Sequence, residues 1–395
     1  MNKHDKALIE EAVRLLEISD EPGLYIRLRR WAREHIKHES NAPIDHIFWP
    51  KGILMCGLMH KAIILRSGDT SADRAVSVYA MASVQNYLDK WISSDCPVYY
   101  IDDCLAGWAL LMLSAVYRTE DPVLHDKYMG AARLMMDYLK RIDDEYDGVI
   151  PYRPLQKTGV VFADGIGMVV PFAVTYGLMN SDDDAIDLGV RQARLFMEQG
   201  IDVGTGLPVH FFKPEEESRL QDEGRSRLQD VGSGEKTEPT DETSDKVGTF
   251  RTSGSMNDMK CWGRSLGWLM YGMGGAVEML TEIGTISPIE ISALKELHGY
   301  LVRLKDAADK YRRPDGLFGS FINEETVPVD TSASAMIMYG LSQAGGGERA
   351  DITPLEPYIR STGRVEGAQG ECLGPGIYSD NYSSYPWSVG ATLML

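Results

Sequence analysis

The polar side chains best placed for chemistry stand at the beginnings of long apolar segments. Asp102 and Asp103 precede CLAGWALLMLSAVY, and Asp164 begins DGIGMVVPFAVTYG. Two carboxylates that share a pocket can serve as the acid and the base of a hydrolysis, and sugar hydrolysis commonly uses such a pair. Because Asp102 and Asp103 cannot both cap one helix, one of them is expected to face the ligand.

A second group combines aromatic and cationic side chains. Trp262 and Trp268 lie on either side of Arg264 in the sequence WGRSLGW. Aromatic rings stack on the apolar face of a sugar, and a guanidinium can hold a carboxylate through two parallel hydrogen bonds. Arg264 begins an otherwise apolar segment, where a buried arginine needs an anion. The alternative is that both tryptophans only fill the wall of the core.

For two further polar residues a structural explanation competes with a functional one. His210 lies in DVGTGLPVHFF, and a single loop histidine is usually structural. Asp330 begins DTSASAMIMYGL. Aspartate is a favoured N-cap because its carboxylate accepts the unpaired N–H groups of the first helical turn. We expect Asp330 to be such a cap.

The elements that must position these residues are helices. Six segments are apolar on almost every side, and a helix of this kind must be buried all round. They begin at Trp49, Asp102, Asp164, Trp262, Asp330 and Tyr385. Segments 126–142, 183–198 and 290–305 are apolar along one stripe, at three- and four-residue steps, which predicts half-buried helices. Alternating patterns typical of β-strands are sparse.

Buried and half-buried helices alternate about six times, at a period of roughly 55–65 residues. The geometry that buries six inner helices and half-buries six outer ones is an (α/α)6 barrel, so this all-α fold is the predicted class. A two-domain helical bundle is the alternative. In the barrel the inner helices are parallel, so their N-termini meet at one rim, where a ligand pocket is expected. Lys51, Asp164 and Trp387 should then lie at the same mouth.

One interval between inner segments is lengthened by residues 214–256. This stretch is acidic and poor in aliphatic residues, and it contains the duplication SRLQDEGR and SRLQDVGS. It predicts a mobile surface loop inserted into a single barrel domain of residues 1–395. A lid over the site is an alternative to plain surface decoration.

The composition excludes several classes of partner. Forty Lys and Arg residues against 58 Asp and Glu give a net charge of −18, which argues against nucleic acid and anionic membranes. No apolar run approaches the ~18 residues of a membrane span, and the first residues form an amphipathic pattern rather than a signal core. Five scattered cysteines are typical of reduced thiols, so a cytoplasmic protein is expected. A zinc site built from Cys261, Cys372 and a histidine is a minor alternative.

Five motifs resemble those of the six-hairpin glycosidases of glycoside hydrolase families 105 and 88, the unsaturated rhamnogalacturonyl and glucuronyl hydrolases. In chain order the motifs are IDDCLAGWALL, ADGIGMVVPFAVTYG, DVGTGLPVH, WGRSLGW and DTSASAMIMYGL. The WGRSLGW motif after a TGLPVH loop is specific, whereas the Asp-headed segments alone would be weak. The resemblance is closer to family 105.

The resemblance implies an (α/α)6 barrel and a hydrolysis that begins at a double bond. Polysaccharide lyases leave a 4,5-unsaturated uronic acid at the non-reducing end of their products. The family's catalytic Asp matches Asp164, which protonates that vinyl ether while water adds at carbon 5. The hemiketal then opens and the neighbouring sugar leaves. Asp102 matches a second Asp that orients the donor or the water.

Other positions resemble the family's substrate-binding residues, and neither a metal nor another cofactor is implied. These positions are His210, Trp262, Arg264 and Trp268. The chain departs from the family pattern after His210, where many members have small residues and an Asp, and at residues 151–153, where many carry a histidine. The departures indicate a different subsite for the neighbouring sugar, in which Tyr152 and Arg153 serve a differently charged group.

Two other functions are compatible with these residues. An ordinary inverting glycosidase would hold Asp102 and Asp164 ~6.5–9.5 Å apart with a water between them. A sugar-binding protein without activity would not need both carboxylates. The preferred hypothesis is therefore an enzyme that acts on a small oligosaccharide bearing an unsaturated uronic acid.

Overall fold

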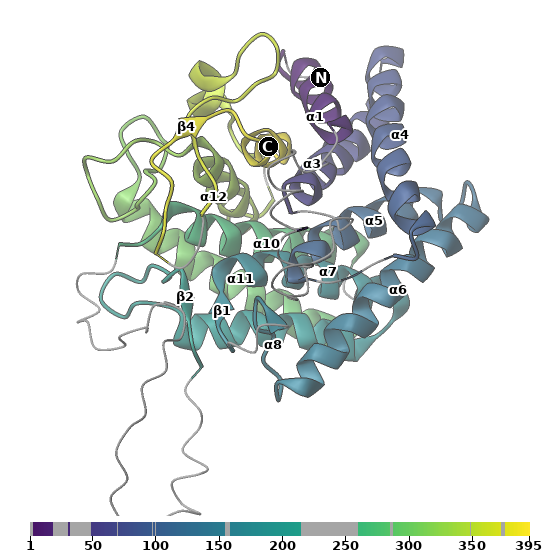
Figure 1. Ribbon diagram of the computed structural model, residues 1–395, viewed down its shortest axis with the longest axis horizontal. Helices are drawn as coiled ribbons and strands as arrows, with labels where there is room; N and C mark the ends of the chain where they lie inside the picture. Colours follow the sequence, from purple (N-terminus) through teal and green to yellow (C-terminus); the bar gives the residue numbers. More distant parts are fainter. Residues whose placement is uncertain are drawn as a thin grey trace, which may run out of the picture.

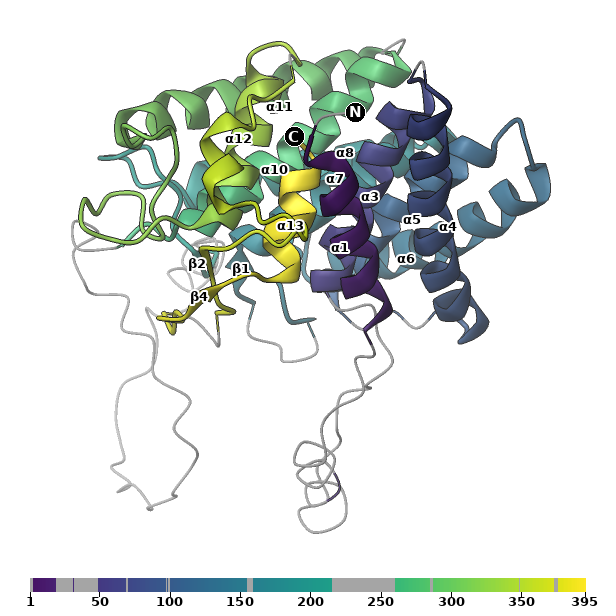
Figure 2. The same cartoon turned by 90° about the horizontal axis from the view of Figure 1, so that it is seen from above.

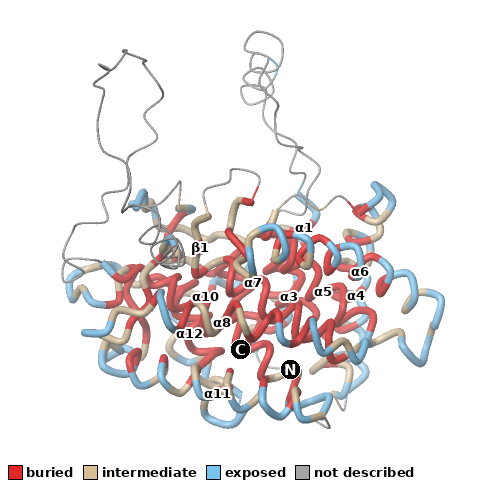
Figure 3. The backbone as a smooth tube through the Cα atoms, turned by 90° about the horizontal axis from the view of Figure 1, so that it is seen from below, coloured by how far each residue is buried: buried red, intermediate tan, exposed pale blue. Residues whose placement is uncertain are grey.

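Six inner helices form a closed ring. The computed structural model describes residues 3–18, 31, 49–68, 70–96, 98, 100–154, 159–214, 260–284, 287–347, 349–372 and 376–395. The inner helices are α3 (Trp49–Arg66), α5 (Cys104–Tyr117), α7 (Ala163–Asn180), α10 (Gly263–Ile283), α12 (Thr331–Ala344) and α13 (Pro386–Leu393). Each packs against the next, and α13 packs against α3, which closes the ring (Figure 1). Their residues are almost all buried, as Figure 3 shows, and the predicted all-α (α/α)6 barrel is confirmed.

Amphipathic helices surround this ring. Four of them follow an inner helix, as predicted: α4 (Ser71–Ser93), α6 (Pro122–Glu145), α8 (Asp183–Gln199) and α11 (Pro288–Ala308). Between α12 and α13 the one helix among the described residues is a short 3-10 helix, η5 (Thr353–Tyr358). Helix α1 (Asp5–Glu17) contacts α13, α3 and α4 instead, so the N-terminal segment supplies the remaining outer helix beside the last inner one (Figure 2).

Glycines let neighbouring inner helices approach closely. A Cβ atom placed on Gly272 of α10 would collide with the backbone of Gly167 on α7. A Cβ on Gly390 of α13 would likewise meet the backbone of α3 at Ile53. The Gly-rich composition of the inner segments is therefore required by backbone-to-backbone packing rather than by flexibility.

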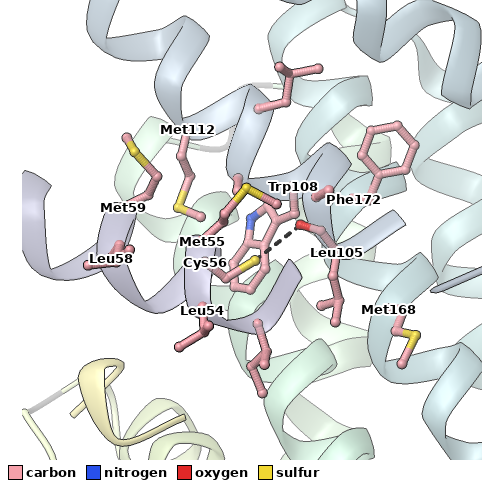
Figure 4. Close-up of a cluster of buried hydrophobic side chains, with 14 of the residues drawn as sticks. Leu54, Met55, Cys56, Leu58, Met59, Leu105, Trp108, Met112, Met168 and Phe172 are labelled. Atoms are coloured by element: carbon pink, nitrogen blue, oxygen red, sulfur yellow. Dashed lines mark hydrogen bonds between the residues drawn. The ribbon is translucent and has the colours of Figure 1, made fainter. Parts of the chain in front are cut away.

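The core between α3, α5 and α7 is filled by sulfur-containing and aromatic side chains. Met55 and Cys56 of α3 lie against Trp108 of α5, and Phe172 of α7 lies on the far side (Figure 4). The Cys56 thiol donates to the carbonyl of Leu105 at 3.1 Å. Burial raises the pKa of this thiol, so Cys56 behaves as a small apolar residue.

Short strands lie at the rim where the inner helices begin. β1 (Val161–Phe162) pairs antiparallel with β2 (Phe211–Phe212), and β3 (Ala368–Gln369) pairs antiparallel with β4 (Tyr382–Ser383). β1 leads directly into α7, and β4 precedes α13. β1, β2 and β4 lie on the same side of the helices in Figure 2.

Lys51 lies in the first turn of α3, and its ammonium group binds the end of a neighbouring helix. Its ammonium group donates to the carbonyls of Leu15, Leu16 and Ile18, at 2.7, 3.1 and 2.7 Å. These are the carbonyls left unpaired at the end of α1, so Lys51 caps that helix and joins it to the ring.

Two sequence predictions concern parts of the chain beyond the barrel itself. The predicted insertion, residues 214–256, lies outside the described residues from residue 215 onward. Its role as a surface loop stays a prediction. Among the described helices, none is long and apolar enough to cross a membrane.

Candidate active site

Asp164 lies in the first turn of α7, and its carboxylate is mostly buried. The N-terminal end of a helix favours a negative charge because the unpaired N–H groups point outward there. Oδ2 of Asp164 is 3.2 Å from Nε2 of His210, and the two side chains are 15% and 5% exposed. Among the described polar groups around Oδ2, this imidazole is the one within ion-pair distance.

The pairing of β1 with β2 brings His210 to Asp164. Phe162 lies opposite Phe211, and the amide of Ala163 donates to the carbonyl of His210 at 3.0 Å. The residue before Phe211 is thereby placed beside the start of α7. His210 is a loop histidine, as predicted, and two strands of two residues each are enough to fix it next to the carboxylate.

The two neighbouring aspartates have different surroundings. Asp103 is fully buried and accepts from the main-chain amide of Tyr100 at 3.1 Å, which stabilises the turn η1 (Ile101–Asp103). Asp102 forms a side-chain hydrogen bond with Tyr152. Burial raises the pKa of the Tyr152 hydroxyl well above its usual range, and the charges of Asp102 and Asp164 raise it further. Tyr152 therefore lies beside both carboxylates, and Asp102 is the member of the pair that shares the site with Asp164.

The side chain of Arg264 is 1% exposed, and its terminal nitrogens bond to the main chain, whereas its buried Nε has no partner among the described residues. Its two terminal nitrogens donate to the carbonyls of Gln369 and Gly370, at 2.8 and 2.6 Å. The guanidinium carbon lies 4.6 Å from the centroid of Trp262. Burial lowers the pKa of Arg264, although nearby Asp330 and Asp164 oppose this shift. In this geometry Arg264 holds the segment at Gln369, and its contact with a substrate carboxylate stays a prediction.

The two tryptophans of the WGRSLGW motif have different neighbours. The indole N–H of Trp262 donates to the side-chain oxygen of Gln369 at 2.7 Å, and its ring lies 4.5 Å from that of His210. Trp268 is 1% exposed and meets Trp49 edge-on at 5.8 Å. Trp262 is thus part of the site, whereas Trp268 contributes to an aromatic layer between inner helices. A direct role of either ring in binding sugar stays a prediction.

Asp330 caps α12, as predicted. Its Oδ1 accepts from the main-chain amides of Ser332 and Ala333 at 3.0 and 3.3 Å, and from the Ser332 hydroxyl at 2.6 Å. The same oxygen lies 3.3 Å from the amide of Gln369. The cap therefore also anchors the segment that Arg264 holds.

Sequence reasoning missed the segment between β3 and β4. It contributes Tyr378, whose hydroxyl lies 3.2 Å from Nδ1 of His210, and Gln369, which bonds to Trp262. It also contributes Glu371. Burial raises the pKa of this carboxyl, although the charges of Arg264 and Arg153 oppose the shift. The segment has no helical periodicity, and the only available signal was its aromatic and polar composition just before an inner helix.

The cysteines of the suggested zinc site have other contacts. Cys261 donates its thiol hydrogen to the carbonyl of Pro208 at 3.1 Å, and burial raises its pKa. Within the part of the chain that the structure describes, no group of three His, Cys, Asp or Glu side chains is arranged to hold a metal ion.

A sequence model of Glycosyl Hydrolase Family 88 matches residues 27–347. The chain belongs to this family. It is therefore a glycoside hydrolase, and the matched range includes Asp102, Asp164, His210 and the WGRSLGW motif. Tyr378 and Glu371 lie beyond the matched residues.

Solved structures of similar fold come from both related families. A possible family 105 member from Salmonella enterica serovar Paratyphi A is 14% identical, with a TM-score of 0.61 over 99% of this chain and 92% of that one. A possible family 105 member from Klebsiella pneumoniae is 13% identical, with a TM-score of 0.63 over 88% and 80%. The unsaturated glucuronyl hydrolase of Bacillus sp. GL1 is 15% identical, with a TM-score of 0.57 over 98% and 93%. A comparison with curated proteins finds no match.

Proposed function

We propose that this family 88 glycoside hydrolase removes a 4,5-unsaturated uronic acid from the non-reducing end of lyase-generated oligosaccharides. The observation that carries the proposal is the placement of Asp164. Its carboxylate lies at the start of an inner helix, against His210 on one side and beside Tyr152 and Asp102 on the other. An acid at the start of one inner helix and a second carboxylate in the turn before another suit proton transfer to a bound sugar.

The reaction assigns one step to each carboxylate. Asp164 gives its proton to carbon 4 of the vinyl ether while the oxygen of a water molecule bonds to carbon 5. The water keeps one proton in the new hydroxyl and gives the other to the carboxylate pair, so the enzyme returns to its starting state. The hemiketal formed at carbon 5 opens, and the neighbouring sugar then leaves. Asp102, held by the Tyr152 hydroxyl, orients the donor or the water.

Only one oxygen of Asp164 is suitable for the proton transfer. Oδ2 is buried beside the imidazole of His210. The remaining oxygen, Oδ1, is therefore the one that meets carbon 4. His210 acts in this scheme by holding the carboxyl rather than by contacting the double bond.

Arg153 is the cation that we assign to an anionic group of the substrate. Its guanidinium carbon lies 5.3 Å from the ring of Tyr100 and 5.4 Å from the ring of Tyr152, so aromatic packing holds it beside the carboxylates. The side chain is half-buried. Arg264 has both terminal nitrogens engaged, which leaves Arg153 as the better placed of the two arginines. In a chain of net charge −18, such a local cation is needed to hold a uronate.

The similar structures support the substrate class. The Bacillus sp. GL1 protein is described as an unsaturated glucuronyl hydrolase responsible for the degradation of glycosaminoglycan. Another similar structure is described with the oligosaccharide dGlcA-Glc-Rha-Glc. We extend to this chain the unsaturated uronic acid at the non-reducing end, with the neighbouring sugar as the group that leaves.

The test follows the double bond directly. The protein is incubated with lyase-generated disaccharides, and the ultraviolet absorbance of the unsaturated uronide is recorded together with release of the second sugar. The proposal predicts loss of the band and release of the sugar in equal amounts. Release from saturated substrates would instead indicate an ordinary inverting glycosidase, and binding without either change would contradict the proposed activity.

A further inference from the structure

Each imidazole nitrogen of His210 has a polar neighbour at 3.2 Å, and the contact with Asp164 is at ion-pair distance without the alignment of a hydrogen bond. Nε2 lies 3.2 Å from Oδ2 of Asp164, and Nδ1 lies 3.2 Å from the hydroxyl of Tyr378. Of the described residues, no other side chain bonds to these two nitrogens. Tyr378, His210 and Asp164 thus form a continuous chain of polar contacts that ends at the proposed proton donor.

The ring of Tyr378 is placed by aromatic packing that does not need its hydroxyl. Its centroid lies 5.3 Å from Trp262 and 5.1 Å from Phe321, which it meets nearly edge-on. The same ring lies 5.6 Å from His210. Because these contacts involve the ring alone, a phenylalanine at this position keeps them and loses only the oxygen.

The partner of one imidazole nitrogen decides which nitrogen carries the hydrogen. A neutral histidine has one N–H, and an O–H donor at Nδ1 leaves that hydrogen on Nε2. Burial raises the pKa of Tyr378, and nearby Cys372 and Asp164 raise it further, so the hydroxyl keeps its proton. Nε2–H can then donate to Oδ2 of Asp164, and the proton of the carboxyl is directed to Oδ1.

We propose that Tyr378 is a positioning residue for the acid step, acting through His210. By donating to Nδ1 it places the hydrogen of the neutral imidazole on Nε2, and so keeps the Asp164 proton on the oxygen that meets the sugar. This inference rests on the proposed role of Asp164 as the proton donor. It adds to the site a residue outside the range that the family model matches.

Other titratable groups also face this chain of contacts. Cys261 and Cys372 lie near Tyr378, and Arg264 and Tyr152 lie near Asp164. These groups are unchanged in a Tyr378→Phe variant. A change in kcat that appears in this variant alone is therefore due to the lost hydroxyl.

The kinetic test compares Tyr378→Phe with Tyr300→Phe. The Tyr300 hydroxyl donates to Glu296 at 2.7 Å on the outer helix α11, so its loss removes a similar hydrogen bond far from His210. In Tyr378→Phe, kcat on the unsaturated disaccharide should fall roughly 3- to 10-fold, the loss of one ordinary hydrogen bond. KM should change little, because the aromatic ring and its packing contacts remain. An unchanged kcat in Tyr378→Phe would overturn the inference.

A second readout does not depend on activity. Nitrogen-15 shifts of the histidine rings should show His210 with hydrogen on Nε2 and none on Nδ1 in the parent protein, with the signal identified by its loss in His210→Asn. Tyr378→Phe should show a mixture of the two neutral forms, with part of the hydrogen on Nδ1. Hydrogen on Nδ1 in the parent would overturn the inference even if Tyr378→Phe failed to fold. If the expected shifts appear while the parent leaves the unsaturated band unchanged, the proposed function fails and not the placement of the hydrogen.

Discussion

Asp164 and Asp102 differ in what their surroundings allow. One oxygen of Asp164 lies against His210, whereas Asp102 forms a hydrogen bond with Tyr152. The charge of Asp164 also raises the pKa of Tyr152. Asp103, next in the chain, is fully buried and accepts from the main-chain amide of Tyr100. Two adjacent residues of the same type thus have different hydrogen-bond partners.

The proton donor is tested with Asp164→Asn. The amide keeps the size of the side chain and one acceptor oxygen, so the fold should persist, but it cannot protonate carbon 4. General acid catalysis is commonly worth ~10²–10⁴ in rate. We expect kcat on an unsaturated disaccharide to fall at least ~10²-fold, with an unaltered melting curve. Near-parental turnover would show that both the residue assignment and the mechanism are wrong.

Arg264→Lys distinguishes substrate binding from support of the segment at Gln369. Lysine keeps the charge but cannot donate to both carbonyls from a planar fork. We expect the free energy of unfolding to fall by about 1–3 kcal/mol, because one buried acceptor loses its partner. A rise in KM should accompany this loss. If KM rises while the free energy of unfolding is unchanged, Arg264 contacts the substrate directly. If neither KM nor the free energy of unfolding changes, Arg264 has neither role.

Single helices of the barrel are joined by polar contacts at positions far from the rim. Glu278 of α10 bonds to His60 of α3 at 3.0 Å and to the hydroxyl of Tyr339 of α12 at 2.5 Å. These residues lie in the later turns of their helices, away from the N-terminal turns that carry the site. One carboxylate therefore ties three inner helices together where the reaction does not use it.

This tie should make stability depend on pH. Burial disfavours the charge of Glu278, but the charge of His60 and the hydrogen bonds from His60 and Tyr339 outweigh it and lower its pKa. A carboxyl with a lower pKa in the folded state stabilises the fold above its ordinary pKa, and that contribution is lost as pH falls through the folded value. Glu278→Gln should cost about 1–3 kcal/mol at pH 6 and less at pH 3.

Chemical denaturation of the parent and of Glu278→Gln at the two pH values measures this difference. Arg194 and Glu296 form a half-buried pair on the outer helices α8 and α11, so Glu296→Gln serves as a comparison outside the inner ring. An equal loss at both pH values would mean that the charge of Glu278 is unimportant to the fold.

At the scale of the whole molecule, the ring brings residues together that the chain separates widely. Arg264 of α10 reaches the carbonyls before α13, and His210 of the loop after α8 reaches the start of α7. The N-terminal helix α1 packs beside α13, so the two ends of the chain complete the same side of the barrel (Figure 1). The long acidic stretch after β2 leaves and re-enters this framework at neighbouring points, since Cys261 lies against the backbone of Pro208.

Removal of that stretch should therefore leave the barrel folded. Residues 218–256 would be replaced by a short Gly-Ser linker. The melting temperature should fall by no more than a few degrees, because loop closure depends only weakly on length. Unchanged KM would favour surface decoration and a raised KM would favour a lid. Loss of a cooperative transition would show that the stretch belongs to the core.

The sequence by itself determined the architecture and the rim at which several polar residues lie. Six segments that are apolar on every side alternate with helices that are apolar along one stripe, which implies an inner and an outer ring. Because the inner helices are parallel, Asp164 and Arg264 lie at one rim. The same pattern says nothing about residues whose roles depend on irregular backbone. The pattern predicts a cation at the rim for Lys51, but its ammonium group caps α1, because three carbonyls at the end of that helix lie within hydrogen-bond distance.

Only the tertiary structure decided which of Asp102 and Asp103 faces the site, where the fork of Arg264 points and which residue holds His210. Each answer depends on hydrogen bonds between segments that have no common periodicity, such as residues 100–103, 208–212 and 368–384. Hydrophobic patterning records which face of a helix is buried, whereas a hydrogen bond requires two groups within about 3 Å. That distance is set by the closure of the ring, so it cannot be predicted from the hydrophobic pattern of the sequence.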